Sequence, residues 1–224
     1  MMGRRPLRSR RTRWAARLGG SLTSWRVQPN HISVAGLLVA GAAGAALLAS
    51  TATGPDLSPY HRGGLLLAAA AGIQLRLLCN LLDGMVAVEG GRKTKGGVVF
   101  NELPDRAADG VLLVCAGYAC AAAVGPAWAA ALGWAAACLA GLTAYVRAFG
   151  ASLGLGQDFR GPMAKQQRMA VLTGACLLGV LQPWTGFGAW AASSLGVALA
   201  VIVAGSAVTV ARRTRRIVAE LDAR

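Results

Sequence analysis

Six long apolar segments constrain what this chain can fold into more than any other feature. Each is close to the roughly 20 residues that an α-helix needs to cross the hydrocarbon core of a bilayer. The chain is 55% hydrophobic and only 14% charged over its 224 residues, which agrees with this interpretation. We therefore predict an all-α integral membrane protein. Its expected spans are about 32–50, 64–88, 102–124, 127–149, 168–184 and 187–211.

Two of these spans begin with residues that can fix the start of a helix. Asn30 and Ser33 lie at the beginning of the first span, and either side chain can cap a helix. Pro104 lies near the beginning of the third span, and proline is tolerated in a first turn because it has no N–H group to satisfy there. We expect a cap at Asn30 or Ser33, and Pro104 in the first turn of the third helix.

Basic residues gather at the two ends of the chain and in two of its loops. The net charge is +14, and the sequence pI is about 11.1. The terminal arginines are Arg4, Arg5, Arg8, Arg10, Arg11, Arg13, Arg17 and Arg26, followed by Arg212, Arg213, Arg215 and Arg216. Basic residues that flank spans mark the cytoplasmic side and favour anionic headgroups, so we interpret this charge as a topological signal rather than as nucleic-acid binding. We expect a multi-pass protein of the cell (plasma) membrane with both termini in the cytoplasm.

The same patterns divide the chain into three regions. Residues 1–28 are a basic segment interleaved with tryptophan and leucine, which predicts an amphipathic helix on the membrane surface; for residues 1–12 a disordered tail is the alternative. Residues 29–211 form the six-helix transmembrane domain, and residues 212–224 form a basic cytoplasmic tail.

The cysteines give no sign of a disulfide framework or of a zinc site. There are five of them, all in apolar segments and without any CxxC pair: Cys79, Cys115, Cys120, Cys138 and Cys176. We expect them to act as small buried hydrophobic residues.

Acidic residues gather where the second span ends and the third begins. Five of the nine carboxylates of the chain lie in this stretch: Asp83, Glu89, Glu102, Asp105 and Asp109. Ionisable groups in or beside a membrane span cost free energy, so they tend to mark function and to face a polar cavity or a partner. We therefore place the candidate site between residues 80 and 109.

Helical spacing brings the polar residues of this stretch onto two faces. On the second helix Asn80 and Asp83 share a face with Arg76, which can pair there with an acidic or phosphate group. On the third helix Asn101, Asp105 and Asp109 follow one another at intervals of four. Where two such faces converge, their oxygen atoms are suitable ligands for Mg²⁺, Mn²⁺ or Ca²⁺.

This stretch resembles the signature of the CDP-alcohol phosphotransferases (CDP-alcohol phosphatidyltransferases), D-x2-D-G-x2-A-R-x8-G-x3-D-x3-D. Aligned without gaps, the signature meets Asn80, Asp83, Gly84, Ala87, Val88, Gly97, Asn101 and Asp105. Asparagine replaces aspartate at positions 80 and 101, and valine replaces arginine at position 88. The resemblance extends to Pro29-Asn30 before the first span, to the number of spans and to the basic segment near Lys165.

The resemblance implies a role for each matched residue. In that family the first three aspartates bind two divalent cations that hold the donor's pyrophosphate, and the fourth deprotonates the acceptor hydroxyl. The implied metal-binding residues are Asn80, Asp83, Asn101 and Asp105, with one or two Mg²⁺ or Mn²⁺ ions as cofactor. The implied nucleotide-binding residues are Asp83, Gly84, Ala87 and Gly97. The implied substrate-phosphate residues are Arg147, Arg160, Lys165 and Arg168.

Two assignments stay open at this stage. The general base is Asp105 in the gapless alignment, or Asp109 if the loop carries four additional residues. A carboxylate missing at position 80 or 101 can be supplied by Glu102 or Glu89.

The resemblance also implies the overall activity. It predicts a metal-dependent transferase of phospholipid biosynthesis that moves a phosphatidyl group from CDP-diacylglycerol to a hydroxyl acceptor and releases CMP, with membrane lipids around it and a homodimer as its assembly. A relative that only binds a nucleotide or lipid is the alternative, because of the two asparagines. A transporter fits less well, since the carboxylates cluster near one membrane face and no interrupted spans occur in two halves.

Overall fold

Six helices make up the part of the chain that the structure describes. The computed structural model describes residues 28–51, 58–88, 96–125, 128–181 and 188–224, and within these ranges it contains no strand. The helices are α2 (Pro29–Ala49), α3 (Pro59–Val88), α4 (Gly97–Val124), α5 (Trp128–Ser152), α6 (Lys165–Val180) and α8 (Gly188–Asp222). The surface helix expected within residues 1–28 lies outside the described residues, apart from Gln28.

The all-α membrane architecture is confirmed. Each of the six expected spans corresponds to one helix, and five of the described helices are long and apolar enough to cross a membrane. The sixth, α6, has 16 residues. All five cysteines are free; Cys120 and Cys176 are buried as expected, whereas Cys79 and Cys115 are half-buried and Cys138 is exposed.

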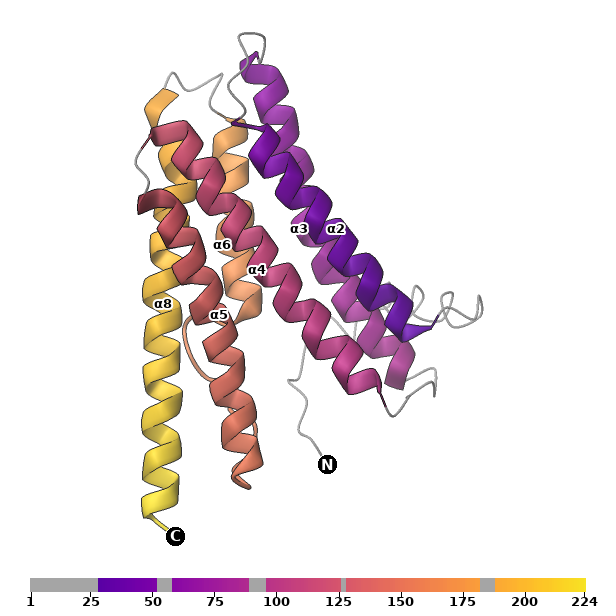
Figure 1. Cartoon of the computed structure of the whole chain (residues 1–224), viewed down its shortest axis with the longest axis vertical. Coiled ribbons are helices and arrows are strands. Elements are labelled where there is room, and N and C mark those ends of the chain that lie inside the picture. Colours follow the sequence, from indigo (N-terminus) through magenta and orange to yellow (C-terminus); the bar gives the residue numbers. More distant parts are fainter. Residues whose placement is uncertain (1–27, 52–57, 89–95, 126–127, 182–187) are drawn as a thin grey trace.

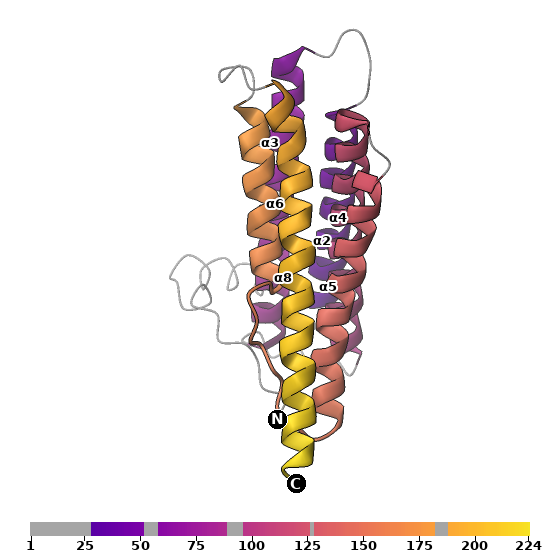
Figure 2. The same ribbon diagram turned by 90° about the vertical axis from the view of Figure 1, so that its left-hand side faces the viewer.

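The helices run up and down through the bundle, as Figure 1 shows. The start of α2 and the C-terminus of α8 lie toward the same end, together with the start of α4 and the end of α3. α2 packs against α3 and α4, and α5 packs between α4 and α8. α6 closes the bundle between α3 and α8, and α5 and α8 project beyond the other helices (Figure 2).

Small residues allow these helices to approach closely. A Cβ atom added to Gly117 on α4 would lie 2.7 Å from the Cα of Gly133 on α5, so only glycine fits this crossing. Small residues at such contacts are typical of membrane helices, where dispersion contacts between backbones replace the hydrophobic driving force. The α4–α5 contact therefore fixes the position of the helix that carries Glu102, Asp105 and Asp109.

Two expectations about helix starts were wrong. α2 begins at Pro29 with Gln28 as its N-cap and has no side-chain cap; Asn30 and Ser33 therefore lie inside the first turns of the helix rather than at the cap position. α4 begins at Gly97, where the carbonyl of Gly96 accepts the first turn's hydrogen bonds, so Pro104 lies inside the helix rather than in its first turn. Proline there leaves the carbonyl of Phe100 without its usual donor.

The C-terminal helix does not stop at the expected domain boundary. α8 continues without a break from Gly188 to Asp222, so the basic residues after position 211 extend a membrane helix as further turns.

Candidate functional site

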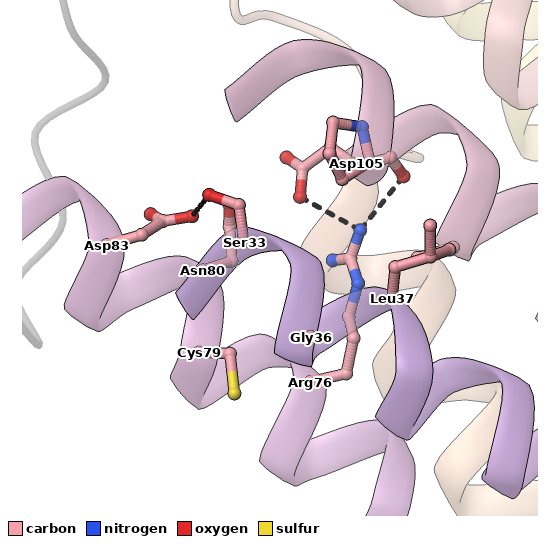
Figure 3. A pocket seen from close by; sticks show the side chains of 10 residues that line it. Ser33, Gly36, Leu37, Arg76, Cys79, Asn80, Asp83 and Asp105 are labelled. Atoms are coloured by element: carbon pink, nitrogen blue, oxygen red, sulfur yellow. Dashed lines mark hydrogen bonds and ion pairs between the residues drawn. The ribbon is translucent and has the colours of Figure 1, made fainter. Parts of the chain in front are cut away.

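The candidate site is a small pocket where α2, α3 and α4 meet, near the end of the bundle from which α2 begins. The residues that line it are Ser33, Gly36, Leu37, Arg76, Cys79, Asn80, Asp83, Pro104, Asp105 and Ala108 (Figure 3). Three of the residues that the sequence singled out, Asn80, Asp83 and Asp105, therefore do converge from two helices.

Asp83 is buried on the α2 side of this pocket, with only 4% of its surface exposed. Its Oδ2 accepts a hydrogen bond of 2.8 Å from the hydroxyl of Ser33, as Figure 3 shows. Its Oδ1 has no hydrogen-bond partner among the described residues. A buried carboxylate oxygen without a donor is costly, which makes it available for a cation.

Asp105 lies on the α4 side and is held by two basic side chains. Arg76 Nη2 lies 3.0 Å from its Oδ1 and donates to its main-chain carbonyl at 2.9 Å (Figure 3). Lys165 Nζ lies 2.6 Å from its Oδ2. Both oxygens of this carboxylate therefore face cations supplied by the chain itself.

Asn80 lies between these groups. With its amide nitrogen turned toward Asp105 it donates to both carboxylate oxygens at 3.1 Å, and its amide oxygen accepts from Lys165 Nζ at 2.8 Å. Asn80, Asp105 and Lys165 thus form a closed triangle of hydrogen bonds drawn from α3, α4 and α6.

Asp109 lies one turn deeper, where 2% of its surface is exposed. Arg76 Nη2 lies 3.1 Å from its Oδ1, and Arg168 Nη2 lies 3.1 Å from its Oδ2. Arg168 also donates to Thr143 and to the carbonyl of Met163. Arg76 therefore bridges two successive carboxylates of α4, and Asp109 is enclosed by guanidinium groups.

The loop between α5 and α6 determines where α6 starts, and therefore where the side chains of Lys165 and Arg168 lie. Arg213 on α8 donates to the carbonyls of Arg160 and Thr143 at 2.9 and 2.6 Å, so the loop is fastened to α8. Asp158 in this loop pairs with Arg160 and Arg216. Burial raises the pKa of Asp158, but the Arg160 N–H and Arg216 outweigh it and hold the pKa below its usual value.

The remaining candidate residues are spread around this centre. Arg147 pairs with Glu102 at 3.0 Å and lies over the ring of Phe159, at the edge of the acidic cluster. Arg160 is 71% exposed and pairs with the loop residue Asp158, so its side chain is outside the pocket.

The other positions of the signature are half-buried: Gly84 and Ala87 near the end of α3, Gly97 at the start of α4 and Asn101 one turn before Asp105. Glu89 lies outside the described residues.

Sequence reasoning found Arg76 but missed the role of Ser33. The face shared with Asn80 and Asp83 predicted that Arg76 would meet an acidic group, and its two carboxylate contacts confirm this. Ser33 was expected only as a helix cap. Its 50-residue separation from Asp83 leaves no local signal for their hydrogen bond.

The donor set for a metal ion is limited. Among the residues that the structure describes, no group of three or more His, Cys, Asp and Glu side chains could hold a metal ion. The pocket itself offers two carboxylates, and that of Asp105 already faces Arg76 and Lys165.

Solved structures share this fold. A crystal structure of Mycobacterium tuberculosis phosphatidylinositol phosphate synthase (PgsA1) with CDP-DAG bound is 20% identical and covers 92% of this chain and 94% of its own, with a TM-score of 0.71. The same protein in complex with manganese and citrate gives a TM-score of 0.69 at 20% identity, covering 91% of this chain and 88% of its own. The fold that the sequence resemblance implies is thereby confirmed. No family model matches this chain, and no curated protein matches it.

Proposed function

We propose that this protein is a membrane transferase that moves the phosphatidyl group of CDP-diacylglycerol to the hydroxyl of an acceptor and releases CMP. One observation carries the proposal. The signature positions Asn80, Asp83 and Asp105 converge in a pocket of this chain, and the chain shares its fold, over nearly its whole length, with a synthase whose structure holds CDP-DAG. The reaction belongs to phospholipid biosynthesis.

Asp105 is the better candidate for the general base. It lines the pocket and is 15% exposed, whereas Asp109 is 2% exposed and enclosed by Arg76 and Arg168. A general base must come within about 2.6–3.2 Å of the hydroxyl that it deprotonates. Asp105 can meet an acceptor in the pocket, and Asp109 instead keeps Arg76 in place.

Lys165 controls access to that carboxylate. Its ammonium group covers Asp105 Oδ2 at 2.6 Å and is only 15% exposed. A phosphate monoester on the acceptor would attract Lys165 away from Asp105, because its dianion is a stronger partner for an ammonium group than a carboxylate. Arrival of the substrate would then free Oδ2 to accept the hydroxyl proton. Arg147 lies close enough to the acidic cluster, through Glu102, to contribute to the same phosphate site.

The pocket can hold a divalent ion at Asp83. The oxygen Oδ1 is buried, unpartnered among the described residues and part of the pocket lining, and carboxylate and amide oxygens suit Mg²⁺ and Mn²⁺. Asp83 would hold the ion through this oxygen; Asn101, the other metal position of the signature, is half-buried one turn before Asp105 and is not among the residues that line the pocket. Such an ion would neutralise charge on the donor's pyrophosphate. Gly84, Ala87 and Gly97 would face the nucleotide.

The proposed assembly and membrane orientation rest on the family resemblance and on the distribution of basic residues in the sequence. We propose a homodimer in the plasma membrane with cytoplasmic termini, so that the pocket receives a lipid donor from the bilayer and a soluble acceptor from the cytosol. The common orientation of the α2 start and the α8 end supports two termini on one side.

CMP release tests the proposal. The purified full-length protein would be incubated with CDP-diacylglycerol, Mn²⁺ or Mg²⁺ and a panel of alcohols, beside Asp83→Ala, Asp105→Ala and the control Asp222→Asn at the exposed end of α8. We expect release with one alcohol, loss in the first two variants and wild-type release in the control.

Other outcomes separate the alternatives. Binding of CDP-diacylglycerol without release for any alcohol would identify a binding protein that has lost catalysis, as asparagines at 80 and 101 suggest. Absence of both binding and release would reject the donor and favour a transporter.

A further inference from the structure

We propose that the Lys165 ammonium group and the Arg76 guanidinium group replace one of the two divalent cations at this site, so that each chain binds a single ion. This inference rests on the proposed function and specifies the cation requirement of the same pocket.

The contacts of Lys165 are those of a cation held by oxygen ligands. Its Nζ lies 2.6 Å from Asp105 Oδ2 and 2.8 Å from the amide oxygen of Asn80. Asn80 and Asp105 are the first and last positions of the signature, on α3 and α4, and Lys165 reaches both from the first turn of α6. The positive charge therefore lies between the two helices that carry the proposed metal residues.

Arg76 completes the replacement on the opposite side of the same carboxylate. Its Nη2 lies 3.0 Å from Asp105 Oδ1 and 3.1 Å from Asp109 Oδ1, and its side chain is 2% exposed. The other terminal nitrogen of Arg76, Nη1, has no hydrogen-bond partner among the described residues. Since Arg76 lines the pocket, this donor is free to contact a phosphate oxygen. Arginine offers phosphate a planar fork of donors with a permanent charge.

Side-chain cations already neutralise the two acidic residues of α4 at this site. Asp105 faces Arg76 and Lys165, with Arg106 Nη2 3.8 Å from its Oδ2, and Asp109 faces Arg76 and Arg168. An aspartate at position 80 would set a second carboxylate directly against that of Asp105, which the Asn80 amide instead contacts at 3.1 Å. Asparagine at this position therefore leaves Lys165 and Arg76 as the cations that Asp105 meets.

Asp83 differs from these two carboxylates. Figure 3 shows it beside Ser33, apart from the contacts between Arg76 and Asp105. Its Oδ1 is unpartnered among the described residues although Asp83 is only 4% exposed. A buried, unpaired carboxylate oxygen that lines a pocket is a place for a ligand of positive charge. One ion at Asp83 would complement the side-chain cations that face Asp105 and Asp109.

Ion counting tests this inference. Mn²⁺ binding to the purified full-length protein would be measured by the loss of the free-ion paramagnetic resonance signal, with and without saturating CDP. Wild type should bind one Mn²⁺ per chain, and Asp83→Asn should bind none. The double variant Asn80→Asp with Lys165→Met should gain a second ion, whereas Lys165→Met alone should gain none. Arg215→Met, a loss of charge on an exposed turn of α8, should leave the count at one.

Several results would overturn the inference. Two ions bound by wild type would mean that a metal displaces Lys165, and no ion bound by wild type would mean that Asp83 does not hold one. A double variant that still binds a single ion would show that Lys165 does not occupy the second position. The number of bound ions tests this inference separately from the proposed function. A protein that releases no CMP and binds no CDP-diacylglycerol still gives a Mn²⁺ stoichiometry.

Discussion

Arg76→Met tests whether the arginine on α3 holds the site together. Arg76 is 2% exposed and contacts Asp105 and Asp109 at 3.0 and 3.1 Å. Methionine fills similar space without the charge, so both carboxylates lose one of their cations. Removing one member of a buried ion pair typically costs about 3–5 kcal/mol, because the remaining charge is left uncompensated.

The expected cost of Arg76→Met lies at the lower end of this range. Asp105 keeps Lys165 and Asp109 keeps Arg168, so neither carboxylate becomes fully unpaired. We expect a loss of about 3 kcal/mol. For a chain of this size each kcal/mol lowers the thermal midpoint by about 2–4 °C, which gives a drop of about 6–12 °C.

The assay is thermal unfolding of the purified protein in detergent, compared with a matched variant. Arg160→Met removes an arginine of the loop between α5 and α6 that is 71% exposed and pairs with Asp158. Exposed pairs contribute about 0–1 kcal/mol, so this control should lower the midpoint by no more than about 4 °C. An Arg76→Met midpoint no lower than that of the control would refute the reasoning that the buried arginine bridges the site.

Three further predictions follow from single contacts. Ser33→Ala removes the hydrogen bond to the buried carboxylate of Asp83 and should cost about 1–3 kcal/mol in thermal unfolding. Gly133→Ala places a Cβ atom 2.8 Å from the backbone of α4 and should cost about 1–3 kcal/mol, whereas Gly141→Ala, with open space around its Cβ, should leave the thermal midpoint unchanged. The lowered pKa of Asp158 means that its contribution to stability is present above its unfolded pKa of about 3.9 and is lost as pH falls through the folded value. The difference in thermal midpoint between wild type and Asp158→Asn should therefore shrink from pH 7 toward acid.

Much of the fold could be predicted from hydropathy alone. Six helices lie where the spans were expected, and five of the described helices are long and apolar enough to cross a membrane, because a bilayer demands long apolar helices. Charge asymmetry indicated which helix ends lie together. Hydropathy does not locate helix starts, since these depend on local hydrogen bonds. Gly97 begins α4 five residues before the expected position, and α2 begins at Pro29, which leaves Asn30 and Ser33 inside the helix rather than at its cap.

The site could be predicted only in part. The spacing of the polar residues correctly predicted that Asn80, Asp83 and Asp105 lie together, because helical periodicity places them on converging faces of α3 and α4. The pairing of Asp105 with Lys165, sixty residues away in sequence, depends on how α6 packs against α3 and on a loop fastened to α8. No local pattern carries that information.

The most direct test of the central claim is to follow the phosphorus atom of CDP-diacylglycerol. The lipid would be labelled with radioactive phosphorus in the phosphatidyl group, and the purified protein would be supplied with Mn²⁺ and each candidate alcohol in turn. A phosphatidyl transferase moves the label into a new lipid only when the right alcohol is present, and Asp105→Ala abolishes the transfer. Label that remains in CDP-diacylglycerol with every alcohol, or that appears only in phosphatidic acid through attack by water, would contradict the account.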